Sequence, residues 1–252
     1  MVGFALCKYY GTTQINPITN EKQHIGMSVD QEIAIGLQSA PSMANQHGGL
    51  HPDQDAQALV KGVGQKLVAN TIAQQSPYRY DFHLLRDQRT VNAFALPGGQ
   101  VFITAALFNR LETEDQLAGV LGHEIGHVLA RHSAERMSKQ ELIQGLTGAA
   151  VMATYDPYNP ASQRSGEVAR YIGNLVSMKY GRDQELQSDD LGVRLMMEAG
   201  YKPEEMVGVM KILKAAAGGG SRKPEFSSTH PDPENRIGRI EEAIEKYRSQ
   251  GL

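Results

Sequence analysis

The amino-acid sequence predicts an α+β fold that is mostly helical and contains one small sheet. Apolar residues recur at helical spacing in both the N-terminal and the C-terminal part of the chain. Between these parts, residues 80–85, 91–96 and 101–103 have the pattern of short strands, and Pro97-Gly98-Gly99 forms a turn before the third. Because the strands are grouped and do not alternate with helices, this order favours α+β over repeated βαβ units.

We expect a single domain over residues 28–252, preceded by an irregular extension over residues 1–27. The chain has 252 residues, of which 40% are hydrophobic and 21% charged, and its formal net charge is −3. These values are ordinary for a globular protein, and the length is sufficient to bury a sizeable core. No internal repeat or low-complexity segment divides the chain.

Capping residues predict where the first helices begin. Residues 28–31, Ser-Val-Asp-Gln, form a capping box that opens one helix. Residues 51–53, His-Pro-Asp, open a second helix, because proline is tolerated in a first helical turn. This helix is expected to reach about Gln75. Residues 113–116, Thr-Glu-Asp-Gln, form another capping box. The helix behind it carries apolar residues at helical spacing, namely Leu117, Val120, Leu121, Val128 and Leu129.

The C-terminal part is predicted to be helical apart from one loop. Residues 155–166 contain two prolines and form a loop, which either covers a cleft as a lid or is a plain connection. The helical pattern resumes near Glu167, at residues 184–198 and after Pro203. A final amphipathic helix is expected over residues 232–248.

Charge and hydropathy exclude nucleic-acid-binding and membrane-spanning proteins. Acidic and basic residues are interspersed without a basic excess, so no feature suits a phosphate backbone. No apolar run reaches the roughly 18–20 residues that a membrane span needs. The nearest run, residues 142–153, is interrupted by Gln144 and Thr147. Its small residues suit close helix packing or, alternatively, a peripheral contact with a membrane surface.

Cys7 is the only cysteine, which excludes an intrachain disulfide and leaves His, Asp and Glu as candidate metal ligands. Residues 4–7 are similar to a lipidation site, but Leu6 is too bulky for the position before the cysteine. The N-terminus also lacks the complete charged, apolar and small-residue pattern of a secretory signal. We therefore expect Cys7 to have no functional role, in a chain that has already lost any leader.

Residues 123–127, His-Glu-Ile-Gly-His, form an H-E-x-x-H motif inside a predicted helix. Residues four apart share one face of a helix, so the imidazoles of His123 and His127 can bind one tetrahedral Zn²⁺. Glu124 is turned by about 100° from His123, which lets it reach a water molecule on the metal as a general base without being a ligand. The alternative, two unrelated histidines on a surface helix, is disfavoured by the apolar neighbours.

His132 is a tempting third ligand, because some zinc proteases place a histidine shortly after the motif. It follows His123 by nine residues, a rotation of about 900°, so it points away from the metal if the helix continues. It also misses the H-E-x-x-H-x-x-G-x-x-H spacing by one residue and lacks the glycine at which that motif turns. We therefore expect His132 to be a partly exposed helix residue, and His132→Ala to leave zinc occupancy unchanged.

Glu185 is the better candidate for the third ligand. Glu185 and Asp189 are four residues apart, which places two carboxylates on one helical face. Such a pair is usually only a solvated face, but the two-histidine helix still lacks a ligand. Glu185 would then complete a His₂Glu site, and Asp189 can orient a ligand imidazole through its other ring nitrogen.

Four segments resemble signature segments of metallopeptidase family forty-eight. They are residues 91–99 (VNAFALPGG), 123–133 (HEIGHVLARHS), 180–189 (YGRDQELQSD) and 228–237 (STHPDPENRI), in the family's order. Residues 16–36 also resemble the N-terminal stretch of the family's periplasmic members. The family includes CAAX prenyl proteases, bacterial heat-shock membrane proteases, and soluble or lipid-anchored periplasmic relatives.

The resemblance implies a zincin-like (gluzincin) fold and a zinc metalloendopeptidase with one Zn²⁺ per chain. Its ligands would be His123, His127 and Glu185, with Glu124 as catalytic base and Asp189 behind a ligand. The implied substrates are unfolded or misfolded envelope proteins, in the periplasm or at the periphery of the cell-envelope membrane. The lack of spanning helices argues against prenylated or membrane-embedded substrates.

Three further residues are expected near the reacting groups. His230 and Tyr180 are candidate donors to the oxyanion of the transition state. His230 would otherwise cap a turn, or occupy the fourth zinc position in a resting form, and Tyr180 would otherwise be a core tyrosine. Arg236 is expected to orient His230 or bind substrate, or to form only a surface salt bridge.

Residues 91–96 are predicted to be an edge strand beside the active-site cleft. A polypeptide can add to such a strand through backbone hydrogen bonds, which gives affinity with limited sequence preference. Asn92, Ala93 and Phe94 are the expected contacts, although Phe94 also suits the core.

Two other functions fit the same ligands. The first is a zinc-bound chaperone or assembly factor with little proteolysis, against which the intact Glu124 favours an enzyme. The second is hydrolysis of small peptides only, against which an edge strand open at both ends would argue.

Overall fold

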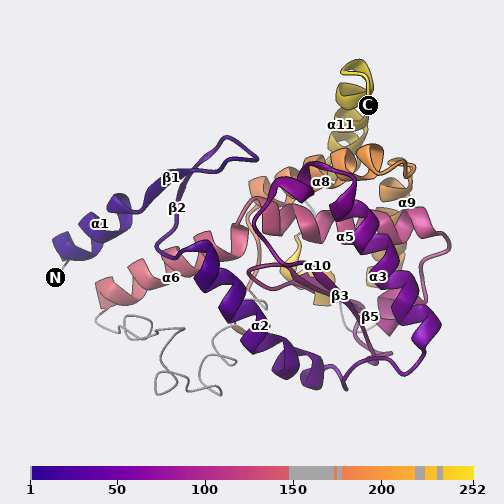
Figure 1. Ribbon diagram of the computed structural model, residues 1–252, viewed down its shortest axis with the longest axis horizontal. Coiled ribbons are helices and arrows are strands. Elements are labelled where there is room, and N and C mark those ends of the chain that lie inside the picture. The colour runs from indigo at the N-terminus through magenta and orange to yellow at the C-terminus, as the bar shows by residue number, and fades with distance from the viewer. Residues whose placement is uncertain (1, 148–172, 175–177, 219–224, 232–234) are drawn as a thin grey trace.

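The described part of the computed structural model consists of residues 2–147, 173–174, 178–218, 225–231 and 235–252. In this part, helices surround a small sheet, as Figure 1 shows. The predicted α+β class is confirmed. The loop expected over residues 155–166 and the start of the helix expected near Glu167 lie outside the described residues.

The central sheet contains three strands, β3 (Asp81–Leu85), β4 (Ala93–Ala95) and β5 (Gln100–Thr104). β5 lies in the middle, parallel to β3 and antiparallel to β4. The turn from β4 into β5 requires Gly98 and Gly99, whose φ angles of 81° and 105° favour glycine. β4 is thus an edge strand of the described sheet, as the sequence predicts.

The helix α2 (Val29–Gln46) precedes the sheet and begins at a capping box. The hydroxyl of Ser28 accepts a hydrogen bond from the backbone N–H of Gln31, whose side chain accepts one from the backbone N–H of Ser28. The predicted start of this helix is therefore confirmed.

The helix α3 (Gln54–Ala69) starts after Asp53, whose carboxylate accepts hydrogen bonds from two backbone N–H groups of the first turn. It is shorter than predicted because Thr71 caps a separate 3₁₀ turn, η1 (Ile72–Gln75).

Three helices follow the sheet, namely α4 (Ala105–Phe108), α5 (Glu114–Leu129) and α6 (His132–Thr147). The side chain of Thr113 caps α5 by accepting a hydrogen bond from the backbone N–H of Gln116. In a complete capping box the Gln116 side chain would accept from the backbone N–H of Thr113. It accepts instead from the N–H of Glu112, so the predicted capping box is only half formed. α5 is buried along almost its entire length, which makes it the central helix of the core.

The C-terminal helices are α8 (Arg182–Glu198), α9 (Glu205–Gly218), α10 (Glu225–Thr229) and α11 (Arg236–Ser249). α11 begins after Asn235, which has a φ angle of 61°, so the helix starts later than the predicted residue 232. None of the described helices is long and apolar enough to cross a membrane.

Glycines allow α5 and α8 to approach each other closely. A β-carbon at Gly126 of α5 would lie 2.8 Å from the backbone oxygen and 3.0 Å from the α-carbon of Ser188 on α8. A β-carbon at Gly192 of α8 would lie 3.1 Å from the backbone nitrogen of His123. Because glycine has no β-carbon, α8 can pack directly against the helix that carries the H-E-x-x-H motif, and this packing places Glu185 beside the motif.

We expect Gly126→Ala to destabilise the protein by about 1–3 kcal/mol, because the added methyl group overpacks this contact. Gly62 in α3 offers a matched control, since a β-carbon there meets nothing within 4 Å. Gly62→Ala should be neutral or stabilising, because alanine favours a helix more than glycine does. Urea denaturation measures both changes, and an unchanged midpoint for Gly126→Ala would contradict the close approach of the two helices.

The segment expected to be an irregular extension is structured, so this expectation was wrong. It forms α1 (Val2–Gly11) and an antiparallel pair of strands, β1 (Thr13–Ile15) and β2 (Lys22–His24). Figure 1 shows α1 beside α6, with which it is in contact.

The contacts that hold this hairpin are distant in sequence, which is why the local pattern does not reveal it. The side-chain amide of Asn16 donates to the backbone oxygen of Leu129 at 2.9 Å, and that of Gln23 donates to Ala130 at 2.6 Å. Both carbonyls belong to the C-terminal end of α5, where no helical partner is available. The hairpin therefore caps the helix that carries the motif.

Candidate metal centre

Four buried side chains meet between α5, α8 and the end of α10. His123 and His127 come from α5, Glu185 comes from α8, and His230 directly follows α10. One possible ligand atom of each lies within 4.8 Å of the others. The structure thus brings together the three ligands proposed from the sequence and adds His230 to them.

His123 and His127, the two candidate ligand histidines, present the same ring nitrogen to Glu185. The Nε2 atoms of His123 and His127 lie 3.1 Å apart. Glu185 Oε1 lies 3.4 Å from Nε2 of His127, and Oε2 lies 3.6 Å from Nε2 of His123. One cation could therefore be bound by all three side chains.

His230 lies against this group of three. Its Nδ1 lies 3.0 Å from Glu185 Oε1 and 3.3 Å from Nε2 of His123. Its backbone N–H donates to the oxygen of Phe226 at 2.7 Å, and the two rings are stacked with centroids 4.3 Å apart. The position of His230 therefore depends on α10.

The residues present fit a zinc ion. Two imidazoles and a carboxylate form one of the ligand sets of catalytic zinc. Glu185 Oε2 is buried and accepts no hydrogen bond in the described structure, although Nη1 of Arg236 lies 3.3 Å away. A buried carboxylate oxygen without a hydrogen bond is costly, and a bound cation would compensate it.

Glu124 lies beside the cluster, as expected for a residue next to His123 on one helix. It is fully buried, and within the described residues neither carboxylate oxygen accepts a hydrogen bond. Burial raises the pKa of Glu124, although the nearby charges of His230 and His123 oppose this effect. A raised pKa suits a general base, which works best near the pH of the reaction.

Asp189 holds His123 from the side opposite the cluster. Its Oδ1 lies 2.8 Å from Nδ1 of His123, while Arg236 donates from Nε to Oδ2 at 2.6 Å and from Nη2 to Oδ1 at 2.9 Å. Burial raises the pKa of Asp189, but the charge of Arg236 and the bond with His123 outweigh it, so the pKa is lowered. Arg236 is only 4% exposed and acts on Asp189, so it does not form a surface salt bridge.

His132 is not the partly exposed residue that the sequence predicts. It is 1% exposed, and its Nδ1 lies 2.8 Å from Nδ1 of His127. The prediction assumed that the helix continues past the motif, whereas α5 ends at Leu129 and α6 begins at His132. The rotation of about 900° therefore does not apply. His132 contacts His127 of the motif but is not one of the four clustered side chains.

Arg131 makes the turn that brings His132 back. Its φ angle is 56°, a left-handed conformation that is uncommon for a residue other than glycine. Its guanidinium forms a buried ion pair with Glu32 and donates to the side chain of Gln14 and the backbone oxygen of Met27. The sequence pattern does not point to Arg131 or Glu32. The one available signal is the position of Glu32 on the apolar face of an amphipathic helix.

Tyr180 packs on His127. Its ring is stacked on that of His127 with centroids 3.7 Å apart, and the Arg136 guanidinium lies 3.7 Å from the centroid of the tyrosine ring. The hydroxyl lies 3.4 Å from Oγ of Ser133. Burial raises the pKa of Tyr180, which keeps the hydroxyl protonated. Its role as a donor to an oxyanion stays a prediction.

The expected substrate-contacting residues lie on and beside β4. The side chain of Phe94 is stacked on Phe102 with ring centroids 5.0 Å apart, so it belongs to the core. Asn92 donates from its side-chain amide to Glu225 at 3.3 Å. Ala93 is fully buried. Its contact with substrate could only be through the backbone.

The backbone of β4 has one side that β5 does not use. Hydrogen bonds between β4 and β5 flank Ala93 and Ala95, because Asn92 accepts from Thr104 and Leu96 donates to Gln100. In an antiparallel pair the residues between such bonds direct their N–H and C=O groups the other way. Ala93 and Ala95 therefore direct these groups towards the free edge of the sheet.

A sequence model of the family described as Peptidase family M48 matches residues 54–244. This region contains all four residues of the ligand cluster and Glu124.

Several relatives are similar over most of this chain. The "Beta-barrel assembly-enhancing protease" of Yersinia pestis is 31% identical over 216 residues, which cover 84% of this chain and 43% of the relative. The protein of the same name from Escherichia coli (strain K12) is 30% identical over 223 residues, 84% of this chain and 45% of the relative. The "Mitochondrial metalloendopeptidase OMA1" of Schizosaccharomyces pombe is 29% identical over 237 residues, 93% of this chain and 67% of the relative. The chain thus spans less than half the length of these bacterial relatives.

Proposed function

Because this chain belongs to peptidase family M48, we propose that it is a zinc-dependent metalloendopeptidase that hydrolyses peptide bonds in unfolded polypeptides. The observation that carries the proposal is the meeting of His123, His127 and Glu185 around one point, with Glu124 beside them. Two histidines one turn apart and a carboxylate from a second helix match a His₂Glu zinc site, which keeps one position open for catalysis.

The chain's own residues supply the proton transfer. When bound, zinc provides an activated water molecule and polarises the scissile carbonyl. Glu124 would accept the proton of the attacking water on a carboxylate oxygen and would deliver it to the nitrogen of the leaving amine. Asp189 and Arg236 keep the His123 ring in place from the opposite side. Tyr180, whose ring lies on His127, is our candidate donor to the oxyanion.

His230 fits the resting form better than the reacting one. Its Nδ1 lies among the ligand atoms, 3.0 Å from Glu185 Oε1, at the place where a substrate carbonyl would have to enter. We therefore assign it to the fourth ligand position of a closed state, in preference to the role of transition-state donor.

The cluster is closed in this arrangement, since each of its four side chains is at most 2% exposed. α10 contributes to the closure, because the backbone N–H of Phe226 donates to the oxygen of Val91 at 3.2 Å and Glu225 accepts from Asn92. In our proposal α10 moves aside together with His230. A polypeptide then adds to β4 through the backbone groups of Ala93 and Ala95.

We place the protein in the periplasm or at the periphery of the cell-envelope membrane, with unfolded or misfolded envelope proteins as substrates. The resemblance to periplasmic family members supports this location. The bacterial relatives named for β-barrel assembly are consistent with it, whereas the relatives named OMA1 are mitochondrial.

Metal removal tests the proposed activity. We expect the purified chain to cut a reduced and alkylated protein into fragments, to lose this activity when zinc is removed with a chelator, and to regain it when zinc is added back. Fragments are detected by gel electrophoresis and mass spectrometry. Undiminished cleavage by the metal-free chain would contradict the proposal.

The closed cluster favours one alternative, a zinc-bound chaperone or assembly factor with little proteolysis. Such a protein would suppress the aggregation of an unfolded substrate without producing fragments. Suppression without cleavage, by zinc-loaded protein over long incubation, would support this alternative and contradict the endopeptidase.

A further inference from the structure

The two ligand histidines, His123 and His127, have different partners at Nδ1, the ring nitrogen that faces away from the ligand cluster. Nδ1 of His123 faces the carboxylate of Asp189 at 2.8 Å, and Arg236 neutralises that carboxylate. Nδ1 of His127 faces no carboxylate but a third imidazole, that of His132, at 2.8 Å. The proposed function uses the first partner and leaves the second without a role.

Metal binding, together with the contacts of the two rings, assigns the hydrogens of His127 and His132. Nε2 of His127 faces the cluster, 3.1 Å from Nε2 of His123 and 3.4 Å from Glu185 Oε1. A metal ion bound there requires an unprotonated Nε2, so the hydrogen of a neutral His127 is on Nδ1. That N–H can donate to His132 only if Nδ1 of His132 is unprotonated.

The other nitrogen of His132 completes the same assignment. Its Nε2 lies 2.7 Å from the side-chain oxygen of Gln187, and its Nδ1 also lies 3.4 Å from the hydroxyl oxygen of Ser188, a group that can donate to it. An amide oxygen only accepts, so Nε2 of His132 carries the hydrogen. One continuous series therefore runs from His127 Nδ1–H to His132 Nδ1, and from His132 Nε2–H to Gln187 Oε1.

We propose that His132 is a positioning residue that acts through His127, fixing its tautomer and ring orientation so that Nε2 is presented to the metal. Gln187 in turn fixes the tautomer of His132. This inference rests on the proposed zinc centre. It also replaces the expectation that His132→Ala would leave zinc occupancy unchanged.

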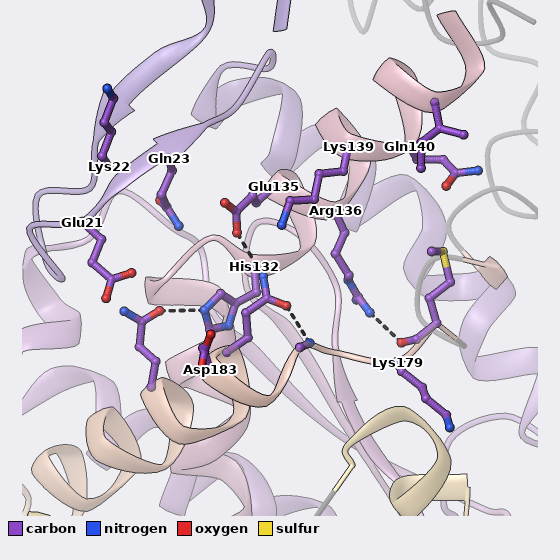
Figure 2. Close-up of a pocket in the computed structure, with 15 residues that line it drawn as sticks. Glu21, Lys22, Gln23, His132, Glu135, Arg136, Lys139, Gln140, Lys179 and Asp183 are labelled. Atoms are coloured by element: carbon purple, nitrogen blue, oxygen red, sulfur yellow. Dashed lines mark hydrogen bonds between the residues drawn. The ribbon is translucent and has the colours of Figure 1, made fainter. Parts of the chain in front are cut away.

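His132 lies at the wall of a cavity. His132 and Gln187 line a cavity of about 490 Å³ between α6, the start of α8 and residues 21–23, and Figure 2 shows His132 on its wall beside Glu135 and Arg136. The side chain of His132 is itself only 1% exposed, so the replacements at this position are chosen to fill a similar volume, and each variant is checked for folding.

The test compares zinc binding by two His132 variants. Leucine fills a similar volume but accepts no hydrogen bond, so we expect His132→Leu to weaken zinc binding by roughly 10–100-fold, the usual effect of losing a partner of a metal ligand. Asparagine can place its side-chain oxygen near the former Nδ1, so His132→Asn should keep most of the affinity. The zinc dissociation constant is measured by competition with a chromophoric chelator, and the absorption spectrum of the cobalt-substituted protein reports the ligand geometry.

Two variants on α8 provide a matched pair. Gln187→Leu removes the partner of His132 and should weaken zinc binding in the same direction. Gln184→Leu changes a glutamine one turn earlier on the same helix, which donates to Glu135 at 3.0 Å, accepts from the backbone N–H of Gly181 at 3.1 Å and forms no hydrogen bond with His132 in the described structure. It should leave the zinc dissociation constant unchanged. This pair keeps the inference testable if His132→Leu does not fold.

The outcomes separate this inference from the proposed function. A wild-type chain that binds no zinc would overturn the metal centre and this inference with it. Wild-type affinity in His132→Leu and Gln187→Leu would overturn the inference alone. Equal losses in His132→Leu and His132→Asn would also overturn it, because the hydrogen-bond acceptor would then not be what matters.

Discussion

Glu124→Gln is expected to lower the rate of cleavage of an unfolded polypeptide by about 10²–10⁴-fold while the zinc content stays the same. The amide has the size of the carboxylate but cannot accept a proton at neutral pH. Glu124 is not one of the clustered ligand residues, and its oxygens accept no hydrogen bond in the described structure. The substitution therefore removes the base without breaking a hydrogen bond, although it also removes the charge that Glu124 places 3.6 Å from Nε2 of His230.

The control for this variant is Glu114→Gln, which makes the same chemical change on the same helix. Glu114 lies in the first turn of α5 and is exposed, so its replacement should leave both cleavage and zinc content unchanged. Cleavage is followed with a reduced and alkylated protein, and zinc is measured by atomic absorption. Because burial raises the pKa of Glu124, its charged form is disfavoured in the fold, and metal-free Glu124→Gln should melt no lower than the wild type. Full activity in Glu124→Gln would rule out this residue as the base.

The arrangement on α5 was accessible from the sequence because it depends on local geometry. A helix fixes the relation between His123 and His127, so the motif alone places both imidazoles on one face. Glu185 and Asp189 follow the same rule on α8. What the sequence could not supply is the contact between the two helices, which depends on glycines that are unremarkable in the local pattern.

The surroundings of His132 were not predictable for a different reason. The turn at Arg131 uses a left-handed conformation at a residue other than glycine, which no local pattern indicates. It is held by Glu32, about a hundred positions away in the chain, and by the hairpin that caps the end of α5. The expectation that α5 continues past Leu129 was therefore wrong, because residues that are distant in sequence end this helix.

Glu185→Ala is expected to weaken zinc binding by more than the roughly 10–100-fold that the loss of a supporting residue costs, because it removes a ligand itself. Both oxygens of Glu185 face the ligand histidines, at 3.4 Å and 3.6 Å, and the pKa of this carboxyl is lowered well below its usual value. Burial alone would raise that pKa, but the charge of His230 and the hydrogen bond with His127 outweigh it. The carboxylate is thus ready to bind a cation.

Asp183→Ala is the matched control for Glu185→Ala, since it removes one negative charge from the first turn of the same helix at an exposed position. It should bind zinc as tightly as the wild type. Both variants are compared as metal-free proteins by circular dichroism, so that a loss of fold is not read as a loss of ligand. If folded Glu185→Ala retained the zinc affinity of the wild type, two histidines of α5 and His230 would have to bind the metal instead. His230 could then not be a residue that moves aside, and the proposed opening of the site would be wrong together with the third ligand.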